Sequence, residues 1–197
     1  KRQLASIEIQ GTKDQQVMFY TSYYHTMINP SVYMDVDGKY RGLDHNIHQA
    51  KGFTNYTIFS LWDTYRAEHP LLMLMKPNEA TDMVKSMIKH QQQSVHGLLP
   101  VWSHMANDNW CMSGYHSTSV LTDAITKGAD VNKEEALKAM VVTSNVSYYD
   151  GIGDYIKVGY FPFDVNGKVN RRLKKFDHMM ISVLIAGSYT PICLIAL

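Results

Sequence analysis

Residues 56–66 read YTIFSLWDTYR, and they give the strongest indication of the fold class because they set charged side chains inside an apolar pattern. Apolar and aromatic residues recur there at spacings of three and four, which favours an amphipathic or largely buried helix over a strand. On such a helix Asp63 and Arg66 share a face with Phe59. The sequence therefore predicts a helix over residues 56–66 that brings a carboxylate and a guanidinium close together.

Two interpretations of these charged residues remain open from the residues alone. Asp63 and Arg66 are three residues apart, so they can form a local ion pair that contributes about 0.2–0.5 kcal/mol, and spacing alone favours this interpretation. Alternatively, Trp62, Asp63 and Arg66 line a pocket. An aromatic plane beside a carboxylate and a guanidinium is an arrangement that grips a polyhydroxylated ring such as a sugar.

The composition is that of an ordinary globular protein. With 197 residues, of which 45% are hydrophobic, the chain is able to bury a core. The formal net charge of +1 and the absence of basic runs indicate neither nucleic acid nor an acidic membrane surface as a partner. The two cysteines, Cys111 and Cys193, provide neither a disulfide scaffold nor the spacing of a zinc site.

Helical patterns recur along the chain and are separated by polar loops. We expect helices over residues 17–29, 56–69, 79–93, 114–127 and 133–142, with Asn78 and Asn132 as N-caps and Gly128 as a stop signal. Met83, Met87 and Ile88 are expected to face inward. Residues 35–52 and 94–113 read as long irregular loops. Alternating runs typical of strands are nearly absent, so the sequence predicts an all-α chain.

The segment DVDG contains two carboxylates that resemble the start of a calcium loop. Asp35 and Asp37 alternate before Gly38, as in an EF-hand loop. However, Lys39 and Asn46 occupy the fifth and twelfth positions, where such a loop places metal ligands. We therefore favour a turn that is held by the Asp side chains over a metal site.

The histidines differ in their sequence context. His45, His48 and His69 lack the spacing of a helical zinc site, so they are expected to be polar loop residues. His116 follows Gly114, which has no side chain and would let the backbone and the imidazole approach a ligand. The simpler alternative for His116 is a helix-start histidine whose ring is satisfied by nearby backbone.

The C-terminal residues 179–197 carry no charge, which is close to the lower limit of a membrane-spanning helix. Pro191 and the Gly187–Ser188 pair argue against one smooth helix, and a buried helix or a tail altered by truncation or frameshift is an equal alternative. We expect no membrane partner. The N-terminal residues show no targeting signal.

Five ordered blocks of this sequence resemble the catalytic domain of glycoside hydrolase family 92, the calcium-dependent exo-acting α-mannosidases. These blocks are FYTSYYHTMINPSVYMDVDGKYRG, YTIFSLWDTYRAEHPL, LPVW, CMSGYHSTSVLTDA and KVGYFP. The resemblance implies that residues 1–173 form part of an (α/α)6 toroid and that residues 174–197 are a divergent or frameshifted tail. It also implies inverting hydrolysis of α-mannosidic bonds in mannose-containing glycans, calcium as a cofactor, and a secreted or periplasmic location.

The resemblance also implies roles for individual residues. Asp63 would accept hydrogen bonds from sugar hydroxyls, with Trp62 and Arg66 shaping the pocket. The segment GYHS would place Gly114, Tyr115 and His116 at the pocket rim. The segment DVDGKYRG would contribute Asp35, Asp37 and Arg41, without an assigned role for any of them.

Three departures from the family pattern limit what the chain can do alone. Residues 103–110 read SHMANDNW where many members carry a Glu-containing ELAGNET-like stretch, which alters the subsite for the second sugar. The catalytic acid, the catalytic base and the main calcium ligands of the family lie downstream of these blocks. The resemblance implies that the family's N-terminal β-sandwich and the rest of the toroid also lie outside these residues. We expect no catalytic residue in this chain, and the alternative function is a non-catalytic carbohydrate-binding or helical interaction module.

Overall fold

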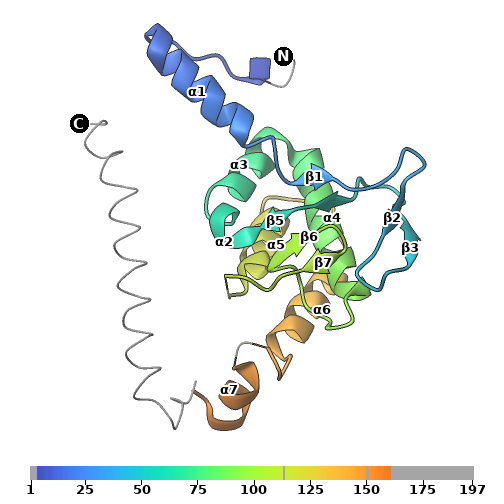
Figure 1. Cartoon of the computed structure of the whole chain (residues 1–197). Coiled ribbons are helices and arrows are strands. Elements are labelled where there is room, and N and C mark those ends of the chain that lie inside the picture. The colour runs from blue at the N-terminus through green and yellow to red at the C-terminus, as the bar shows by residue number, and fades with distance from the viewer. Residues whose placement is uncertain (1–3, 113, 150, 161–197) are drawn as a thin grey trace. The chain divides into compact units, whose positions relative to one another are not determined.

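The computed structural model describes residues 4–112, 114–149 and 151–160 (Figure 1). The chain divides into two units, Lys1–Gly153 and Asp154–Leu197, and the sites below lie in the first unit. The expected domain boundary at residue 173, the apolar tail and Cys193 lie outside the described residues. No helix within the described ranges is long and apolar enough to cross a membrane.

Helices and short strands alternate in the first half of the described chain. In chain order the elements are a 3₁₀ turn (Leu4–Ser6), α1 (Lys13–His25), β1 (Ser31–Val32), β2 (Lys39–Arg41), β3 (Ile47–Gln49), β4 (Tyr56–Thr57), β5 (Phe59–Ser60), α2 (Leu61–Thr64), α3 (Glu68–Met75), α4 (Pro77–Gln93), β6 (Trp102–His104), β7 (Asn107–Asp108), α5 (His116–Thr126), α6 (Lys133–Ser144) and α7 (Ile152–Val158).

The strands form three small antiparallel sheets, so the prediction of an all-α chain was wrong for the described residues. Strand β1 pairs with β4, β2 forms a hairpin with β3, and β5, β6 and β7 make a three-stranded sheet. The hairpin replaces the irregular loop that we expected over residues 35–52. Each strand has only two or three residues, which is too short to leave a period-two pattern in the sequence.

The helix predicted over residues 56–66 is also wrong in its first half. The backbone runs through β4, turns at Ile58 in the left-handed region with φ of 64°, and continues through β5 before α2 begins at Leu61. Phe59 and Leu61 are both buried in the main core, which explains the apolar pattern in that segment. The apolar spacing therefore reflects burial on two different elements and not one helix face.

Helix α4 is the central element of the core, and it contacts α3, α5 and α6 (Figure 1). Met83, Met87 and Ile88 are buried, as the sequence predicted. The predicted N-cap is wrong, because Pro77 is the first helical residue and Asn78 lies inside the helix. Proline suits this position, since its missing N–H would have no partner in the helix.

The ends of α6 and α5 follow the sequence signals closely. Asn132 caps α6, where its side chain accepts hydrogen bonds from the amides of Glu134 and Glu135. Gly128 follows α5 with φ of 89°, the left-handed conformation that ends helices. The N-terminal helix α1 begins at Lys13, four residues before the predicted start, because Thr12 and Gln15 form a capping box.

Candidate functional site

The short helix α2 presents Trp62 and Asp63 to solvent. The Trp62 side chain is 42% exposed, which is unusual for the largest aromatic side chain. The Asp63 carboxylate accepts a hydrogen bond from the Ser60 hydroxyl. Among the ion pairs of the described residues, none joins Asp63 to Arg66. The local ion pair that the spacing favoured is therefore absent, and Asp63 keeps acceptor capacity for a ligand.

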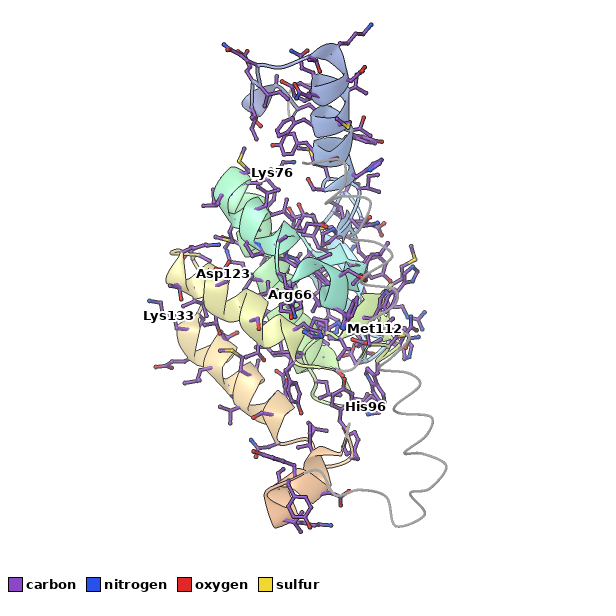
Figure 2. The ribbon with its side chains drawn as sticks, turned by 90° about the vertical axis from the view of Figure 1, so that its left-hand side faces the viewer. Arg66, Lys76, His96, Met112, Asp123 and Lys133 are labelled. Atoms are coloured by element: carbon purple, nitrogen blue, oxygen red, sulfur yellow. The ribbon has the colours of Figure 1, made fainter. Side chains whose placement is uncertain are left out.

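Arg66 turns toward Tyr65 instead. Its Nε donates a hydrogen bond of 2.6 Å to the Tyr65 hydroxyl, and its guanidinium carbon lies 5.2 Å from the centre of the Tyr65 ring. This distance is within the range of a cation–π contact. The Arg66 side chain is exposed, and Figure 2 shows it beside α5. Its remaining N–H groups are free to donate to a ligand.

Tyr65 also joins the two sequence blocks from which a sugar pocket was predicted. Its ring stacks on the His116 ring, with 4.5 Å between the centroids and an angle of 24° between the planes. His116 is the first residue of α5, and α2 contacts α5 directly. The structure therefore places α2, which carries Trp62 and Asp63, next to the helix that begins with His116. The resemblance did not assign a role to Tyr65.

Gly114 makes room for the His116 ring, and the approach of this segment to a ligand stays a prediction. Its φ is +139°, a conformation that side chains with a Cβ rarely adopt. A Cβ placed on Gly114 would lie 2.7 Å from Nε2 of His116. The glycine thus leaves the space that the imidazole occupies, and Tyr115, between the two, is half-buried beside the Tyr149 ring.

Two titratable residues at the start of α3 were missed or misplaced by the sequence analysis. Burial and, to a smaller extent, the charge of Asp63 raise the pKa of Glu68 to about 7. His69 was expected to be a polar loop residue, but it lies in α3, is only 3% exposed and packs near Phe59. Burial lowers the pKa of His69 to about 4, so its ring is neutral at pH 7. Glu68 carried no sequence signal beyond an acidic residue in a first helical turn.

Asp35 and Asp37 lie in a different part of the molecule. Asp37 accepts hydrogen bonds from the Lys39 amide at 3.0 Å and from Lys39 Nζ at 2.6 Å, and this side-chain bond is the main cause of its lowered pKa. The Asp37 carboxylate therefore holds this turn, as predicted, whereas Asp35 contributes its backbone carbonyl, which accepts from the Gly38 amide. Figure 1 shows the β2–β3 hairpin, which carries Arg41, well away from α2.

The described residues do not fit a calcium site by themselves. Within residues 4–112, 114–149 and 151–160, no three His, Cys, Asp or Glu side chains cluster in a way that could hold a metal ion. Asp37 is paired with Lys39, and Asp44 contacts the His48 ring at 2.9 Å, so both carboxylates already have local partners. Three or more oxygen ligands with net negative charge are typical of calcium sites. We derive no chemical step through calcium from these residues.

Comparison with known protein families and structures shows what this chain is similar to. The model of the glycosyl hydrolase family 92 catalytic domain matches residues 1–189. No curated protein matches the chain.

Two solved structures show the similarity in three dimensions. The family GH92 α-mannosidase BT3965 from Bacteroides thetaiotaomicron, solved in complex with mannoimidazole, is 44% identical with a TM-score of 0.80, over 83% of this chain and 22% of that chain. The inverting family GH92 mannosidase BT2199 from Bacteroides thetaiotaomicron VPI-5482 is 32% identical with a TM-score of 0.72, over 83% of this chain and 23% of that one. This chain thus spans less than a quarter of either relative. Because the family model covers nearly all of its residues, the chain belongs to glycosyl hydrolase family 92.

Proposed function

We propose that the chain supplies part of the glycone-binding pocket of an inverting, exo-acting α-mannosidase that hydrolyses α-mannosidic bonds of glycans. The single observation that carries the proposal is the state of Asp63. Among the described residues, its carboxylate is hydrogen-bonded only to the Ser60 hydroxyl, and it lies next to the exposed Trp62. A carboxylate without a cation partner beside an exposed indole is suited to accept hydrogen bonds from sugar hydroxyls.

Each residue of the pocket has a distinct part in the proposal. Asp63 accepts from two neighbouring hydroxyls of the mannose ring, and the Trp62 indole covers an apolar face of the sugar. Arg66 donates to a ring or hydroxyl oxygen and is held in place by Tyr65. His116 also holds Tyr65, through ring stacking. Gly114 and Tyr115 form the rim, and the aromatic stack keeps the rim against α2.

Bond cleavage is assigned to residues outside this chain. Inverting glycosidases use a carboxylic acid to protonate the leaving oxygen and a carboxylate base to activate water. In the proposal these two groups and the calcium ligands come from other segments of the enzyme, as does the rest of an (α/α)6 toroid. Calcium would contribute positive charge beside the sugar hydroxyls when it is bound. We also propose that the enzyme is secreted or periplasmic.

A chimeric enzyme tests this function. The matching segment of BT3965 is replaced by this chain, and hydrolysis of an α-mannoside is followed by NMR, which resolves the anomer released first. We expect turnover with inversion of the anomeric centre, and loss of turnover with a calcium chelator. The matched control is Asp123→Asn in the same chimera, because Asp123 binds Lys127 on the surface of α5 at 2.7 Å, and this variant should keep full activity.

The alternative function makes a different prediction in the same assay. A folded chimera that binds mannoimidazole but releases no mannose would contradict the enzymatic proposal and support a non-catalytic carbohydrate-binding module. A folded chimera that neither binds nor hydrolyses would contradict both functions. Circular dichroism and the thermal midpoint of each chimera, compared with those of BT3965, establish folding independently.

A further inference from the structure

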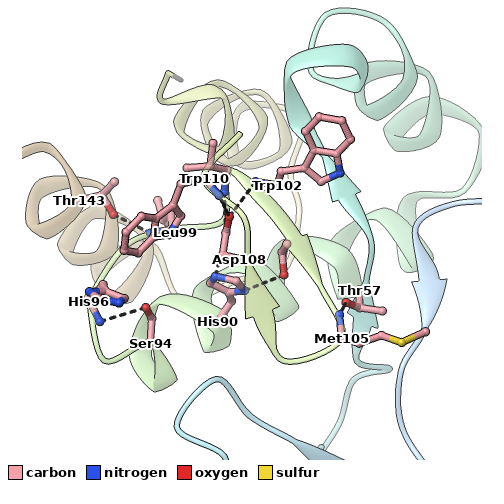
Figure 3. A network of polar contacts seen from close by, with 12 residues as sticks. Thr57, His90, Ser94, His96, Leu99, Trp102, Met105, Asp108, Trp110 and Thr143 are labelled. Carbon is pink, nitrogen blue, oxygen red and sulfur yellow. Dashed lines mark hydrogen bonds and ion pairs between the residues drawn. The ribbon is translucent and has the colours of Figure 1, made fainter. Parts of the chain in front are cut away.

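A buried carboxylate organises the loop between α4 and α5. The Asp108 side chain is only 4% exposed, although it sits at the end of the short strand β7. Its Oδ1 accepts hydrogen bonds from the amides of Trp102 at 3.0 Å and Trp110 at 2.9 Å. Its Oδ2 accepts from the amide of Val101 at 2.9 Å. One side chain therefore binds backbone amides on both sides of the β6–β7 turn, as Figure 3 shows.

His90 connects this carboxylate to the central helix. The His90 ring, on α4, places Nε2 3.4 Å from Oδ2 of Asp108 and Nδ1 3.1 Å from the Ser103 hydroxyl. A carboxylate can only accept, so the ring proton belongs on Nε2, and Nδ1 accepts from Ser103. The loop is thus bound to His90 of α4 twice, through the Asp108 carboxylate and through the Ser103 hydroxyl of β6.

Burying the Asp108 carboxylate costs free energy unless hydrogen-bond donors occupy its acceptor sites. Burial raises the pKa of Asp108, but hydrogen bonds from His90 and from the Val101 and Trp110 amides outweigh it and keep the pKa below the usual value. The loop also contains left-handed residues at Met105, Ala106 and Trp110, which cost free energy. The Asp108 contacts offset this cost and fix one loop conformation.

The fixed loop leads directly to the sugar pocket. Trp102 lies opposite Ser60 in the β5–β6 pair, and the Ser60 hydroxyl donates to the Asp63 carboxylate. The Trp102 side chain is half-buried, and Figure 3 shows its indole directed away from Asp108 on the side of β5. Asp108 binds the Trp102 amide, so the position of Trp102 opposite Ser60 depends on a carboxylate that is only 4% exposed and that no sugar could reach.

We propose that Asp108, together with His90, is a positioning residue that holds the Trp102 indole beside the Ser60–Asp63 pair as a second aromatic wall of the mannose pocket. The proposal rests on the proposed function in that the ligand is the sugar bound by Asp63. It adds a further sugar-contacting residue, Trp102, and a buried pair that acts only through it.

Amide hydrogen exchange on the 197-residue chain tests the positioning role without any ligand. We expect Asp108→Asn to speed exchange of the Val101, Trp102 and Trp110 amides at least about tenfold, because an amide side chain offers one acceptor oxygen in place of two. The Leu99 amide is the internal reference, since it binds the Thr143 hydroxyl at 2.9 Å and should keep its protection. Asp123→Asn is the matched control, and it should leave all four amides unchanged.

Kinetics of the chimera test the contact with the sugar. We expect Trp102→Ala and Asp108→Asn each to raise KM about tenfold with a smaller change in kcat, as the loss of a binding contact does. His90→Gln should give a weaker effect of the same kind, because Gln retains a donor toward Asp108. It also serves as the second variant if Asp108→Asn does not fold.

The outcomes separate this proposal from the proposed function. Unchanged exchange at Val101, Trp102 and Trp110 in both Asp108→Asn and His90→Gln would overturn the positioning role. Faster exchange with an unchanged KM would overturn the sugar contact of Trp102. An inactive parent chimera contradicts the proposed function and, with it, the sugar contact of Trp102, while the exchange experiment still decides whether Asp108 positions the loop.

Discussion

The β2–β3 hairpin and the α2–α3 segment both carry acidic residues and histidines, but they balance these charges in opposite ways. In the hairpin, Asp37 pairs with Lys39 and Asp44 with His48. In the α2–α3 segment, the partner of Asp63 among the described residues is a hydroxyl, and the pKa shifts of Glu68 and His69 favour the neutral form of each side chain. Carboxylates whose oxygens already bind neighbouring residues stabilise the fold, whereas a carboxylate with unoccupied acceptor sites can bind a ligand.

Removal of the Asp63 carboxylate should give the largest effect. In the chimera, Asp63→Ala is expected to abolish detectable mannoside turnover, and the loss of its hydrogen bonds should weaken mannoimidazole binding by roughly 1.5–3 kcal/mol. Asp63 is exposed, so the thermal midpoint should not change. Turnover and calorimetric titration are the measurements. If Asp63→Ala has an unchanged thermal midpoint and wild-type kinetics, the α2–α3 segment does not differ from the β2–β3 hairpin in ligand binding.

This distinction could be predicted only in part from the sequence. The fold followed the sequence where local signals are strong, as at the Asn132 cap and the buried Met83 and Met87 face. The strands were missed because each is held by its cross-strand partner, and that partner lies as far away as Ser103 from Phe59. Tertiary pairing of this kind overrides helical spacing.

The candidate site shows the same limit. The spacing of Asp63 and Arg66 suggested an ion pair on one helix face, but α2 ends at Thr64, so the two residues do not share a helix. The stacking of Tyr65 on His116 joins residues that are far apart in sequence, and only the family resemblance had grouped their blocks. Spare acceptor capacity on Asp63 is a property of its surroundings, which no local motif contains.

The free energy of unfolding should depend on pH because of His69, the buried histidine of the α2–α3 segment. His69 has a folded-state pKa of about 4 against an ordinary value of 6.5, so the unfolded chain binds more protons between these values. The contribution of His69 to stability should therefore fall by about 3 kcal/mol as the pH drops from 6.5 to 4, and Glu68 offsets part of this fall. Denaturant unfolding at a series of pH values measures the net change, and His69→Gln should remove the His69 contribution. A slope that persists in His69→Gln would assign the effect to another group.

Gly114→Ala tests the contact between the two blocks. The added methyl group would lie 2.7 Å from the His116 ring at a φ of +139°, so the backbone or the imidazole must move. We expect a loss of about 1–3 kcal/mol in stability and a higher KM in the chimera, since Tyr65 loses its stacking partner. Gly52→Ala is the matched control, because its φ of +74° gives backbone strain but no atom lies within 4 Å of the added Cβ. Equal effects of both variants would show that strain alone is responsible.

Glu68 should give a smaller pH effect of the opposite sign. Its folded-state pKa of about 7 exceeds the ordinary 4.5, so the folded chain binds more protons in this range, and stability falls as the pH rises from 4.5 to 7. Glu68 is half-exposed, so solvent screening reduces the effect to about 1 kcal/mol. Glu68→Gln should remove it and leave the His69 slope steeper, as measured by the same unfolding series. A Glu68→Gln variant with an unchanged pH profile would contradict the raised pKa.

A substitution in the β2–β3 hairpin should have the smallest effect on stability and kinetics. Asp37→Asn removes the Lys39 ion pair on a fully exposed turn, where such pairs contribute little to stability. Because the hairpin lies away from α2, we expect the KM and kcat of the chimera to stay within about twofold of the parent. The family resemblance implied a site role for Asp37, and the same variant tests that role against its local pairing. A tenfold rise in KM for Asp37→Asn, with the thermal midpoint unchanged, would contradict this expectation. It would show that a carboxylate with a local ion-pair partner can still take part in sugar binding, so that local pairing does not distinguish the two regions.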